Sequence, residues 1–205
     1  LAEGFWSFFG DFENQAVIKE LDTTIEDLAQ EVTFTQFNLR KNCRNTPRIV
    51  SQLEGFTNLY PKYNGTLRHD NGSDPDLLFY TSKENQSEQL IQKLEELYKE
   101  GYQGNDITIL STNNKNPVPE RGLGPKWAGR IKEYSIDNNQ DIQWTTIYSF
   151  KGLESPAIIL TDIYGLSNEK ELNLLYVGMS RALSNLTLLL SHKLRKRIQN
   201  ILLGL

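Results

Sequence analysis

A short polar stretch of the chain carries side chains that can do chemistry, because Lys151, Gly152 and Glu154 lie between two runs typical of buried strands. A glycine there lets the backbone approach a ligand, while Lys151 and Glu154 project from the same loop. Arg44 precedes a predicted helix start, where free amides and the helix dipole favour an anion. Arg181 follows a later apolar segment. Two arginines that face a phosphate are typical of phosphoryl transfer, so the pattern predicts phosphate chemistry.

Each of these features also has an ordinary structural interpretation. A surface arginine is usually a solvated charge, and the tetrapeptide KGLE at 151–154 is common where a turn leads into a helix. The sequence has no GxxxxGK[ST] loop and no acidic strand end after one, so it lacks the residues that hold nucleotide phosphates and magnesium. We therefore interpret the constellation as half of a site.

Composition narrows the class of protein. The 205 residues, 38% of them hydrophobic, can bury a core and most simply form one domain. The net charge of -4 gives no global basic field for nucleic acid, although a local basic patch remains compatible with it. A single cysteine, Cys43, excludes an internal disulfide, and with only His69 and His192 beside it no zinc spacing can be assembled. No metal site is predicted.

The two ends of the sequence give expectations about its context. No apolar run approaches the roughly 20 residues of a membrane span, and no signal-peptide pattern opens the chain, so we expect a cytoplasmic protein. The chain begins with Leu1 and enters an aromatic run at once, which predicts a piece of a longer protein. If the aromatic strand Phe5–Phe9 has lost its sheet partners, its free edge is expected to promote self-association.

Strands and helices alternate along the chain. Strands are predicted at residues 5–11, 32–39, 76–82, 106–112, 142–149, 157–163 and 185–191. Helices are predicted at residues 45–60, 81–101, 169–183 and 193–203, and a Pro/Gly/Asn loop at 113–126. Because the later strands are continuously apolar, they are expected to be buried on both faces. The sequence therefore predicts an α/β fold with a mainly parallel sheet between helices.

Two predicted helices carry the clearest signals. Pro47 suits the first position of one helix, and its apolar face consists of Ile49, Val50, Leu53 and Phe56. The other helix has a capping box from Thr81 to Glu84 and ends at Gly101. Its apolar stripe consists of Leu90, Ile91, Leu94, Leu97 and Tyr98.

Two further expectations concern where the candidate side chains lie. In open parallel sheets ligands bind at the carboxyl ends of the strands, and both Arg44 and the 151–154 cluster are expected there. Arg181 is placed on the predicted helix 169–183, off the apolar stripe of Leu172, Leu175, Tyr176 and Met179. From that position Arg181 is expected to reach across a cleft.

Four segments, in order, resemble the later motifs of superfamily 1 helicases of the UvrD/Rep type. GDFENQAVI resembles motif III, NLRKNCRNTPRIV motif IV, TTIYSFKGLE motif V and LLYVGMSRA motif VI. The resemblance implies a RecA-like (P-loop NTPase-like) three-layer sandwich that lacks its own phosphate loop. It also implies that residues 1–20 end a first RecA-like domain, and that residues 21–205 form the second.

In that family the second RecA-like domain closes over ATP and Mg that are held mainly by the first domain. By the resemblance, Gln15 senses the γ-phosphate, and Arg44 and Arg181 contact it in the transition state. The residues that line the nucleotide are Lys151, Gly152 and Glu154, with Glu154 near the ribose. The residues that match contacts to the nucleic-acid backbone are Thr146, Tyr148 and Ser149.

The chain also departs from the family pattern. Residues 51–144, between motifs IV and V, are filled by a strand-helix-strand pattern, so the large inserted accessory domain of the long enzymes has no room. The short connection predicts a compact variant of the UvrD-type enzymes, without that inserted domain. Cys43 replaces the usual tyrosine, and Tyr148 stands where a histidine is common. Three residues separate Gly10-Asp11 from Gln15, where the family usually has two.

The sequence thus predicts the C-terminal half of an ATP-dependent helicase, which alone hydrolyses no ATP. Its expected partners are single-stranded nucleic acid, DNA rather than RNA, and an N-terminal RecA-like domain. Two alternatives stay open: an inactive nucleic-acid-binding or protein-docking module, and an unrelated α/β domain for a small anion. The basic segment HKLRKRIQN is interpreted as a solvated last helical turn favoured by the dipole, with a phosphate-contacting patch as the alternative.

Overall fold

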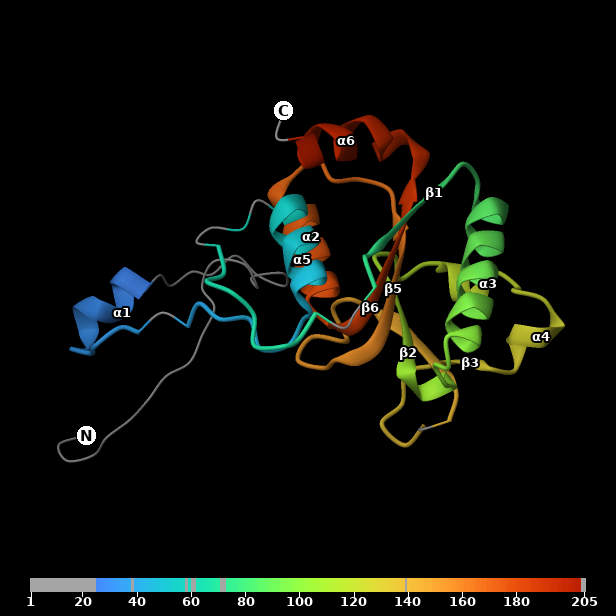
Figure 1. Ribbon diagram of the computed structural model, residues 1–205, viewed down its shortest axis with the longest axis horizontal. Coiled ribbons are helices and arrows are strands. Elements are labelled where there is room, and N and C mark those ends of the chain that lie inside the picture. The colour runs from blue at the N-terminus through green and yellow to red at the C-terminus, as the bar shows by residue number, and fades with distance from the viewer. Residues whose placement is uncertain are drawn as a thin grey trace.

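One parallel sheet organises the molecule. The computed structural model describes residues 25–203, apart from 38, 58, 60–61, 71–72 and 139. Within these residues six strands form a sheet in the order β1-β6-β5-β2-β4-β3, and every neighbouring pair is parallel (Figure 1). The strands are Asp76–Tyr80 (β1), Ile107–Ser111 (β2), Ile131–Glu133 (β3), Ile142–Thr146 (β4), Ser155–Ile163 (β5) and Ala182–Ser191 (β6). The predicted parallel α/β sheet is confirmed.

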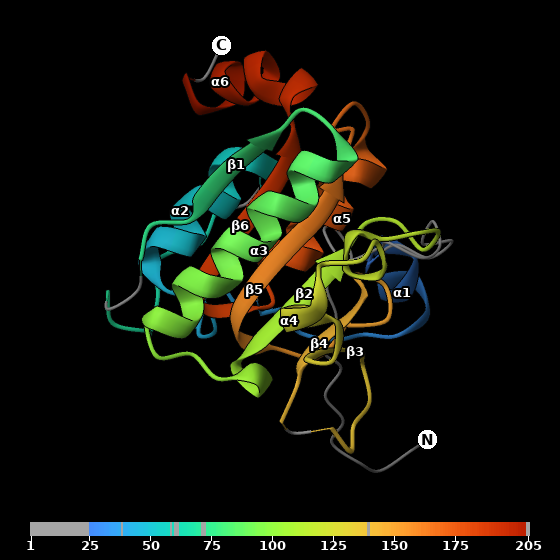
Figure 2. The same ribbon diagram turned by 90° about the vertical axis from the view of Figure 1, so that its right-hand side faces the viewer.

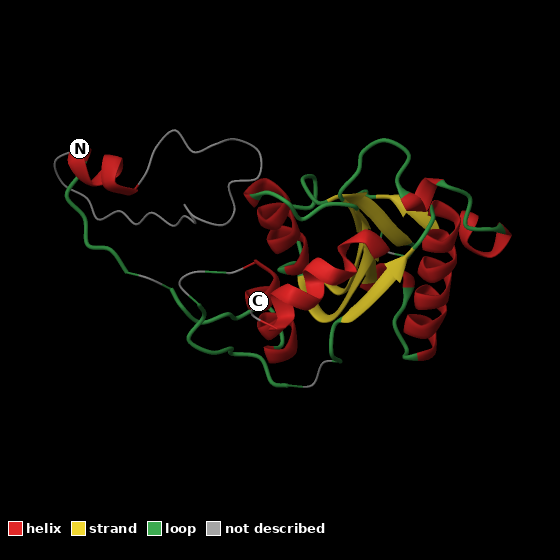
Figure 3. Ribbon diagram, turned by 90° about the horizontal axis from the view of Figure 1, so that it is seen from above, coloured by secondary structure: helices red, strands yellow, loops and turns green. Residues whose placement is uncertain are grey.

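Helices cover both faces of this sheet (Figures 2 and 3). One face carries α2 (Pro47–Thr57) and α5 (Glu169–Met179), with α6 (Arg195–Leu203) beside them at the end of β6. The other face carries α3 (Lys83–Lys99) and α4 (Pro125–Ala128). Short 3-10 turns lie at Gly104–Asp106 (η1), Val118–Glu120 (η2) and His192–Leu194 (η3). Among the described helices none is long and apolar enough to span a membrane.

The continuous apolar strands serve two separate cores. Along β5, Ile158 and Leu160 pack in the α2 and α5 core, whereas Ile159 packs in the α3 core. Leu188 and Leu189 of β6 divide between the two cores in the same way. Because successive strand side chains point to opposite faces, a strand with helices on both sides must be apolar throughout.

The predicted start of α2 and the predicted apolar faces of α2 and α3 are confirmed, whereas the predicted cap of α3 is not. Pro47 begins α2, and its predicted apolar face is buried. The apolar stripe of α3 also packs inward, but its N-cap is Ser82 and not Thr81, because the Ser82 side chain accepts from the backbone N–H of Asn85. The Asn85 side chain in turn accepts from the backbone N–H of Thr81. The cap therefore lies one residue later than predicted.

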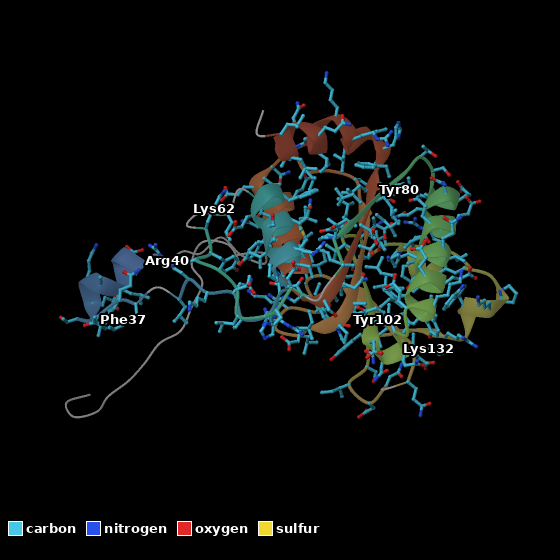
Figure 4. The ribbon with its side chains drawn as sticks, in the orientation of Figure 1. Phe37, Arg40, Lys62, Tyr80, Tyr102 and Lys132 are labelled. Atoms are coloured by element: carbon cyan, nitrogen blue, oxygen red, sulfur yellow. The ribbon has the colours of Figure 1, made fainter. Side chains whose placement is uncertain are left out.

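The predicted strand at residues 32–39 is wrong. Residues 33–37 and 39–40 have no regular secondary structure and pair with no strand of the described sheet. Phe37 is 82% exposed and Leu39 is 81% exposed, so alternating apolar residues here have no second strand to bury them. Figure 4 shows Phe37 and Arg40 on this arm, which joins α1 (Ile25–Glu31) to the sheet domain.

The middle of the chain contains more structure than predicted. The 113–126 loop contains η2 and the start of α4, and it buries Val118 and Leu123 against α3. Trp127 of α4 is buried in the same core. The edge strand β3 was not predicted, because its three residues are too few to show an alternating pattern. The predicted strand 5–11, the 1–20 domain boundary, Gln15 and the Phe5–Phe9 edge lie outside the described residues.

Candidate nucleotide-facing site

Arg44 and Glu154 meet although 110 positions separate them in the sequence. The Nε of Arg44 donates to Oε2 of Glu154 at 2.8 Å, and the two side chains are 34% and 50% exposed. Arg44 lies just before α2, and Glu154 lies just before β5. The structure therefore brings the predicted motif IV arginine to the predicted motif V glutamate.

Two asparagines fix the backbone that carries Arg44. The Oδ1 atom of Asn42 accepts from the backbone N–H of Arg44 at 3.0 Å and from that of Asn45 at 2.8 Å. The Nδ2 of Asn42 also donates to Oδ1 of Asn45 at 2.9 Å. Both asparagine side chains are buried, so this turn is held by internal hydrogen bonds rather than by water.

Asn45 also joins this turn to the segment around Arg181. Its Nδ2 donates to the carbonyl oxygens of Ser180 at 3.3 Å and Ala182 at 2.6 Å, one on each side of Arg181. Asn45 is 1% exposed, and a buried amide that loses such partners costs free energy. The residue is therefore a positioning residue for Arg181. The Asn45 contact was not predicted, because an interaction across 137 positions leaves no local signal in the sequence.

Arg181 differs from its predicted setting. Helix α5 ends at Met179 and Ser180 is its C-cap, so Arg181 lies in the link between α5 and β6 and not on the helix. The residue is 2% exposed and does not reach across an open cleft as predicted. Its Nε donates to the carbonyl oxygen of Val177 at 3.0 Å, and Nη1 donates to that of Leu153 at 3.4 Å. Nη2 is buried with no hydrogen-bond partner among the described residues.

The surroundings of Arg181 disfavour its positive charge. Burial lowers the pKa of Arg181, and the nearby charge of Arg44 lowers it further. Glu154 and Tyr176 act in the opposite direction but do not reverse the shift. A buried cation beside a second cation, with one N–H group unpaired, is a favourable place for an anion.

The arginines lie at the opposite edge of the sheet from the one predicted. Glu154 precedes β5 and Arg181 precedes β6, so both belong to the amino-terminal edge of these parallel strands. The expectation of a carboxyl-edge crevice is therefore wrong for this group. Arg44 reaches the same edge because α2 begins beside the end of α5, as the Asn45 contacts show. The site is built from a helix start, a helix end and two strand starts.

The motif V segment crosses from one edge of the sheet to the other. β4 ends at Thr146 and not at Ser149, and residues 147–152 form turns. Ile147 and Phe150 are buried in the α2 and α5 core, which ties the segment to that face. Thr146 of β4 and Thr161 of β5 both pair with Ser111 of β2, so they lie at the same level of the sheet. Thr161 is six residues after Ser155, the first residue of β5. At about 3.3 Å per residue the two edges are about 20 Å apart.

The candidate nucleic-acid residues therefore lie away from the arginines. The Thr146 and Ser149 hydroxyls are 3.0 Å apart, and the Thr146 hydroxyl accepts from the backbone N–H of Ser149 at 3.2 Å. Ser149 is exposed, whereas Tyr148 is half-buried and packs against the α2 and α5 core. These polar groups lie at the carboxyl end of β4.

Gly152 and Lys151 lie between the two groups and are exposed. Gly152 has a φ of +93°, and a Cβ there would meet no atom within 4 Å. Glycine is therefore required by the backbone conformation and leaves the loop surface open. Among the described residues no group of three or more His, Cys, Asp and Glu side chains is arranged to hold a metal ion.

A second buried charge cluster lies at the carboxyl edge and was not predicted. Asp162 is fully buried with a φ of +61°, and it forms a salt bridge with Arg121, whose side chain is 8% exposed. Oδ2 of Asp162 accepts from the Ser111 hydroxyl at 2.7 Å and from the backbone N–H of Val118 at 3.1 Å. Tyr164 donates to the other carboxylate oxygen at 3.2 Å. The cluster fastens the 113–126 loop to the ends of β2 and β5.

Comparisons with known proteins agree with this architecture. Residues 142–189 match the family model for the UvrD-like helicase C-terminal domain. The matched segment includes Glu154 and Arg181 but not Arg44. No curated protein matches the chain.

A similar solved structure is the C-terminal domain of a possible DNA helicase from Lactobacillus plantarum WCFS1. The match covers 72% of this chain and 87% of that one, with a TM-score of 0.53 and 18% sequence identity, and at this identity it establishes the fold alone. The family match over residues 142–189 and the shared fold confirm the predicted resemblance to the RecA-like C-terminal domain of UvrD-like superfamily 1 helicases.

Proposed function

We propose that this chain is the second RecA-like domain of an ATP-dependent DNA helicase. In this proposal an N-terminal RecA-like domain holds ATP and Mg, and this domain closes over them. Arg44 and Arg181 then contact the γ-phosphate and stabilise the charge that develops during transfer to water. Gln15 is assigned to sense the same phosphate.

The unpaired Nη2 atom of Arg181 carries the proposal. A buried guanidinium normally has partners for all its N–H groups, whereas Nη2 of Arg181 has none among the described residues. The nearby charge of Arg44 opposes that of Arg181, and the Glu154 carboxylate forms its salt bridge with Arg44. A phosphate oxygen would supply the missing acceptor and would relieve the repulsion from Arg44. Because Nη2 is covered, the proposal requires the guanidinium to swing outward or its cover to open when the two domains close.

The remaining nucleotide contacts are assigned to residues of the 151–154 loop. Glu154 orients Arg44 in the structure described here and is assigned to the ribose side of the nucleotide. Lys151 and Gly152 are exposed on the same loop and are assigned to line the nucleotide cleft. Because the sequence has no GxxxxGK[ST] loop, this chain alone is expected to hydrolyse no ATP.

The strand contacts are assigned to Thr146, Tyr148 and Ser149. Hydroxyl and backbone groups at the carboxyl end of β4 are suited to phosphates and sugars rather than to base edges. The 147–154 segment joins these residues directly to Glu154, so a movement at the nucleotide edge has a short covalent route to the strand edge. DNA is favoured over RNA because the similar solved structure is described as the C-terminal domain of a possible DNA helicase.

The test is DNA-stimulated ATP hydrolysis by the protein in which this domain follows its N-terminal RecA-like partner. Arg44→Ala and Arg181→Ala are each expected to raise the barrier by about 2 to 4 kcal/mol while nucleotide binding is kept. The present chain alone should be silent. If both variants turn over normally, or if the longer protein has no ATPase activity, the inactive binding or docking module becomes the better account.

A further inference from the structure

Helix α6 and the turn before it carry a dense group of cations. Lys193, Arg195, Lys196 and Arg197 are exposed, and together they are called the α6 basic face. No acidic residue occurs from Ser191 to the last residue. This concentration contrasts with the net charge of -4 for the whole chain. Figure 4 shows nitrogen-tipped side chains pointing away from the molecule along α6.

The fold gives a structural contact to only one of these cations, Arg195. Leu194 and Ile198 dock α6 onto the α2 and α5 core, and Lys193, Lys196 and Arg197 take no part in that packing. The salt bridges of the described residues involve none of them, and the Arg195 guanidinium lies over the Phe79 ring at 5.3 Å. Three of the cations occupy the first turn of α6, where positive charge opposes the helix dipole. The expectation of a last helical turn favoured by the dipole is therefore wrong.

The α6 basic face lies at the same edge of the sheet as the candidate nucleic-acid residues. β6 ends at Ser191, level with Tyr80 at the end of β1, and α6 follows directly (Figures 1 and 2). β4 ends at Thr146 on the same carboxyl edge. Only β5 and β2 separate β6 from β4, and three strand spacings of about 4.8 Å give about 14 Å.

We infer that the α6 basic face binds the phosphates of a nucleic-acid strand and extends the track that begins at Thr146 and Ser149. This inference rests on the proposed function, since it concerns the strand that the helicase would follow. The lateral spacing of about 14 Å between β4 and β6 alone corresponds to about four phosphate spacings along one strand of a duplex. Lysine and arginine side chains in an exposed, acid-free group suit phosphates of any sequence, so the contact fixes the path of the strand and not its sequence.

The test measures the salt dependence of oligonucleotide binding by this chain. A fluorescent single-stranded oligonucleotide and the matching duplex are titrated by anisotropy over a series of salt concentrations. The variant carries Arg195→Gln, Lys196→Gln and Arg197→Gln. For the single strand, loss of three phosphate contacts should lower the slope of log K against log salt by about 2, and should weaken binding by up to about a hundredfold near 0.1 M salt.

A matched control removes the same charge elsewhere. Lys99→Gln, Arg130→Gln and Lys132→Gln neutralise three exposed cations that take no part in the α6 basic face or the described salt bridges. This control should keep the wild-type slope. Thermal unfolding of both triple variants checks that the exposed substitutions leave the fold intact.

Each outcome of the titrations either supports or overturns the inferred contact between α6 and nucleic acid. A lower slope of log K against log salt in the α6 variant alone supports the inference. The oligonucleotide whose slope falls more, the single strand or the duplex, is the form that contacts α6. Equal slopes in both variants overturn the inference but leave the arginine site and the proposed function untouched. If the wild-type chain binds neither oligonucleotide but binds poly-glutamate through α6, the partner is an acidic polypeptide and the inference fails.

Discussion

Two buried arginines lie at opposite edges of the sheet and have opposite surroundings. At the carboxyl edge, Arg121 donates to Asp162, to the Gln86 side chain at 2.8 Å and to the Asn116 carbonyl oxygen at 3.0 Å. At the amino edge, Arg181 donates only to backbone carbonyl oxygens, and its Nη2 has no partner among the described residues. One arginine is internally paired, and the other is not.

The pKa directions express the same difference. Burial lowers the pKa of both guanidinium groups. At Arg121 burial is the largest single effect, but Asp162 and Tyr164 together outweigh it and the pKa is raised. At Arg181 the charge of Arg44 adds to burial and the pKa is lowered. A paired buried charge is part of the fold, and an unpaired one is expected where a ligand completes the site.

The largest expected loss of stability comes from replacing Arg121, the arginine that is paired with Asp162. Arg121→Met leaves the Asp162 carboxylate buried without its cation and should lower the free energy of unfolding by about 3 to 5 kcal/mol. Urea denaturation at neutral pH measures this loss. The exposed Arg130→Met is the control and should stay within about 0.5 kcal/mol of wild type. A loss below about 1 kcal/mol at Arg121 would show that the Asp162 cluster is not structural.

The next effect concerns the link between the two halves of the arginine site. Asn45→Ala removes the donor to the Ser180 and Ala182 carbonyl oxygens and should cost about 1 to 3 kcal/mol of stability. If the proposed function holds, Asn45→Ala should also lower kcat in the two-domain protein, because Arg181 loses its positioning. Asn64→Ala, at an exposed loop position, serves as the control. Unchanged turnover in a folded Asn45→Ala protein would remove its positioning role.

Arg181→Met should change the free energy of unfolding differently from Arg121→Met. Methionine keeps an unbranched apolar side chain and removes a buried, unpaired charge, so stability should stay within about 1 kcal/mol of wild type or rise. The same urea series that compares Arg121→Met with wild type makes the measurement. A loss as large as that of Arg121→Met would mean that Arg181 is held by the fold and not kept for a ligand.

The smallest effect is expected at the exposed pair. Glu154→Gln breaks the salt bridge with Arg44, whose partners are 34% and 50% exposed, and should change stability by at most about 0.5 kcal/mol. The difference from wild type should vanish at high salt because exposed charges are screened. A cost above about 2 kcal/mol, independent of salt, would indicate that this pair is a structural element like the Asp162 cluster.

Local sequence signals were sufficient for most of the regular structure. Pro47 marked the start of α2 correctly, and the apolar stripe at Leu90, Leu94 and Leu97 marked α3. The continuous apolar run in β5 correctly indicated burial on both faces. These features depend on neighbours within a few positions of one another, so the sequence contains them directly.

Features that depend on distant contacts were not predictable in the same way. The alternation at residues 32–39 indicated a strand, but no described strand lies beside it to accept its hydrogen bonds. Arg181 was placed on a helix because nothing in its local sequence shows that α5 ends at Met179. Arg44 and Glu154 lie together as the sequence motifs suggested, and their role as site residues stays a prediction. The edge of the sheet was predicted wrongly, because it depends on topology.

The most direct test of the proposed function is ATP turnover by the two-domain protein with Arg181→Met beside wild type, under saturating DNA and nucleotide. Since this variant is expected to fold at least as well as wild type, lost activity cannot be attributed to unfolding. We expect kcat to fall by about 10²- to 10³-fold with nucleotide affinity retained. A kcat within about twofold of wild type would contradict the assignment of Arg181 to the phosphate.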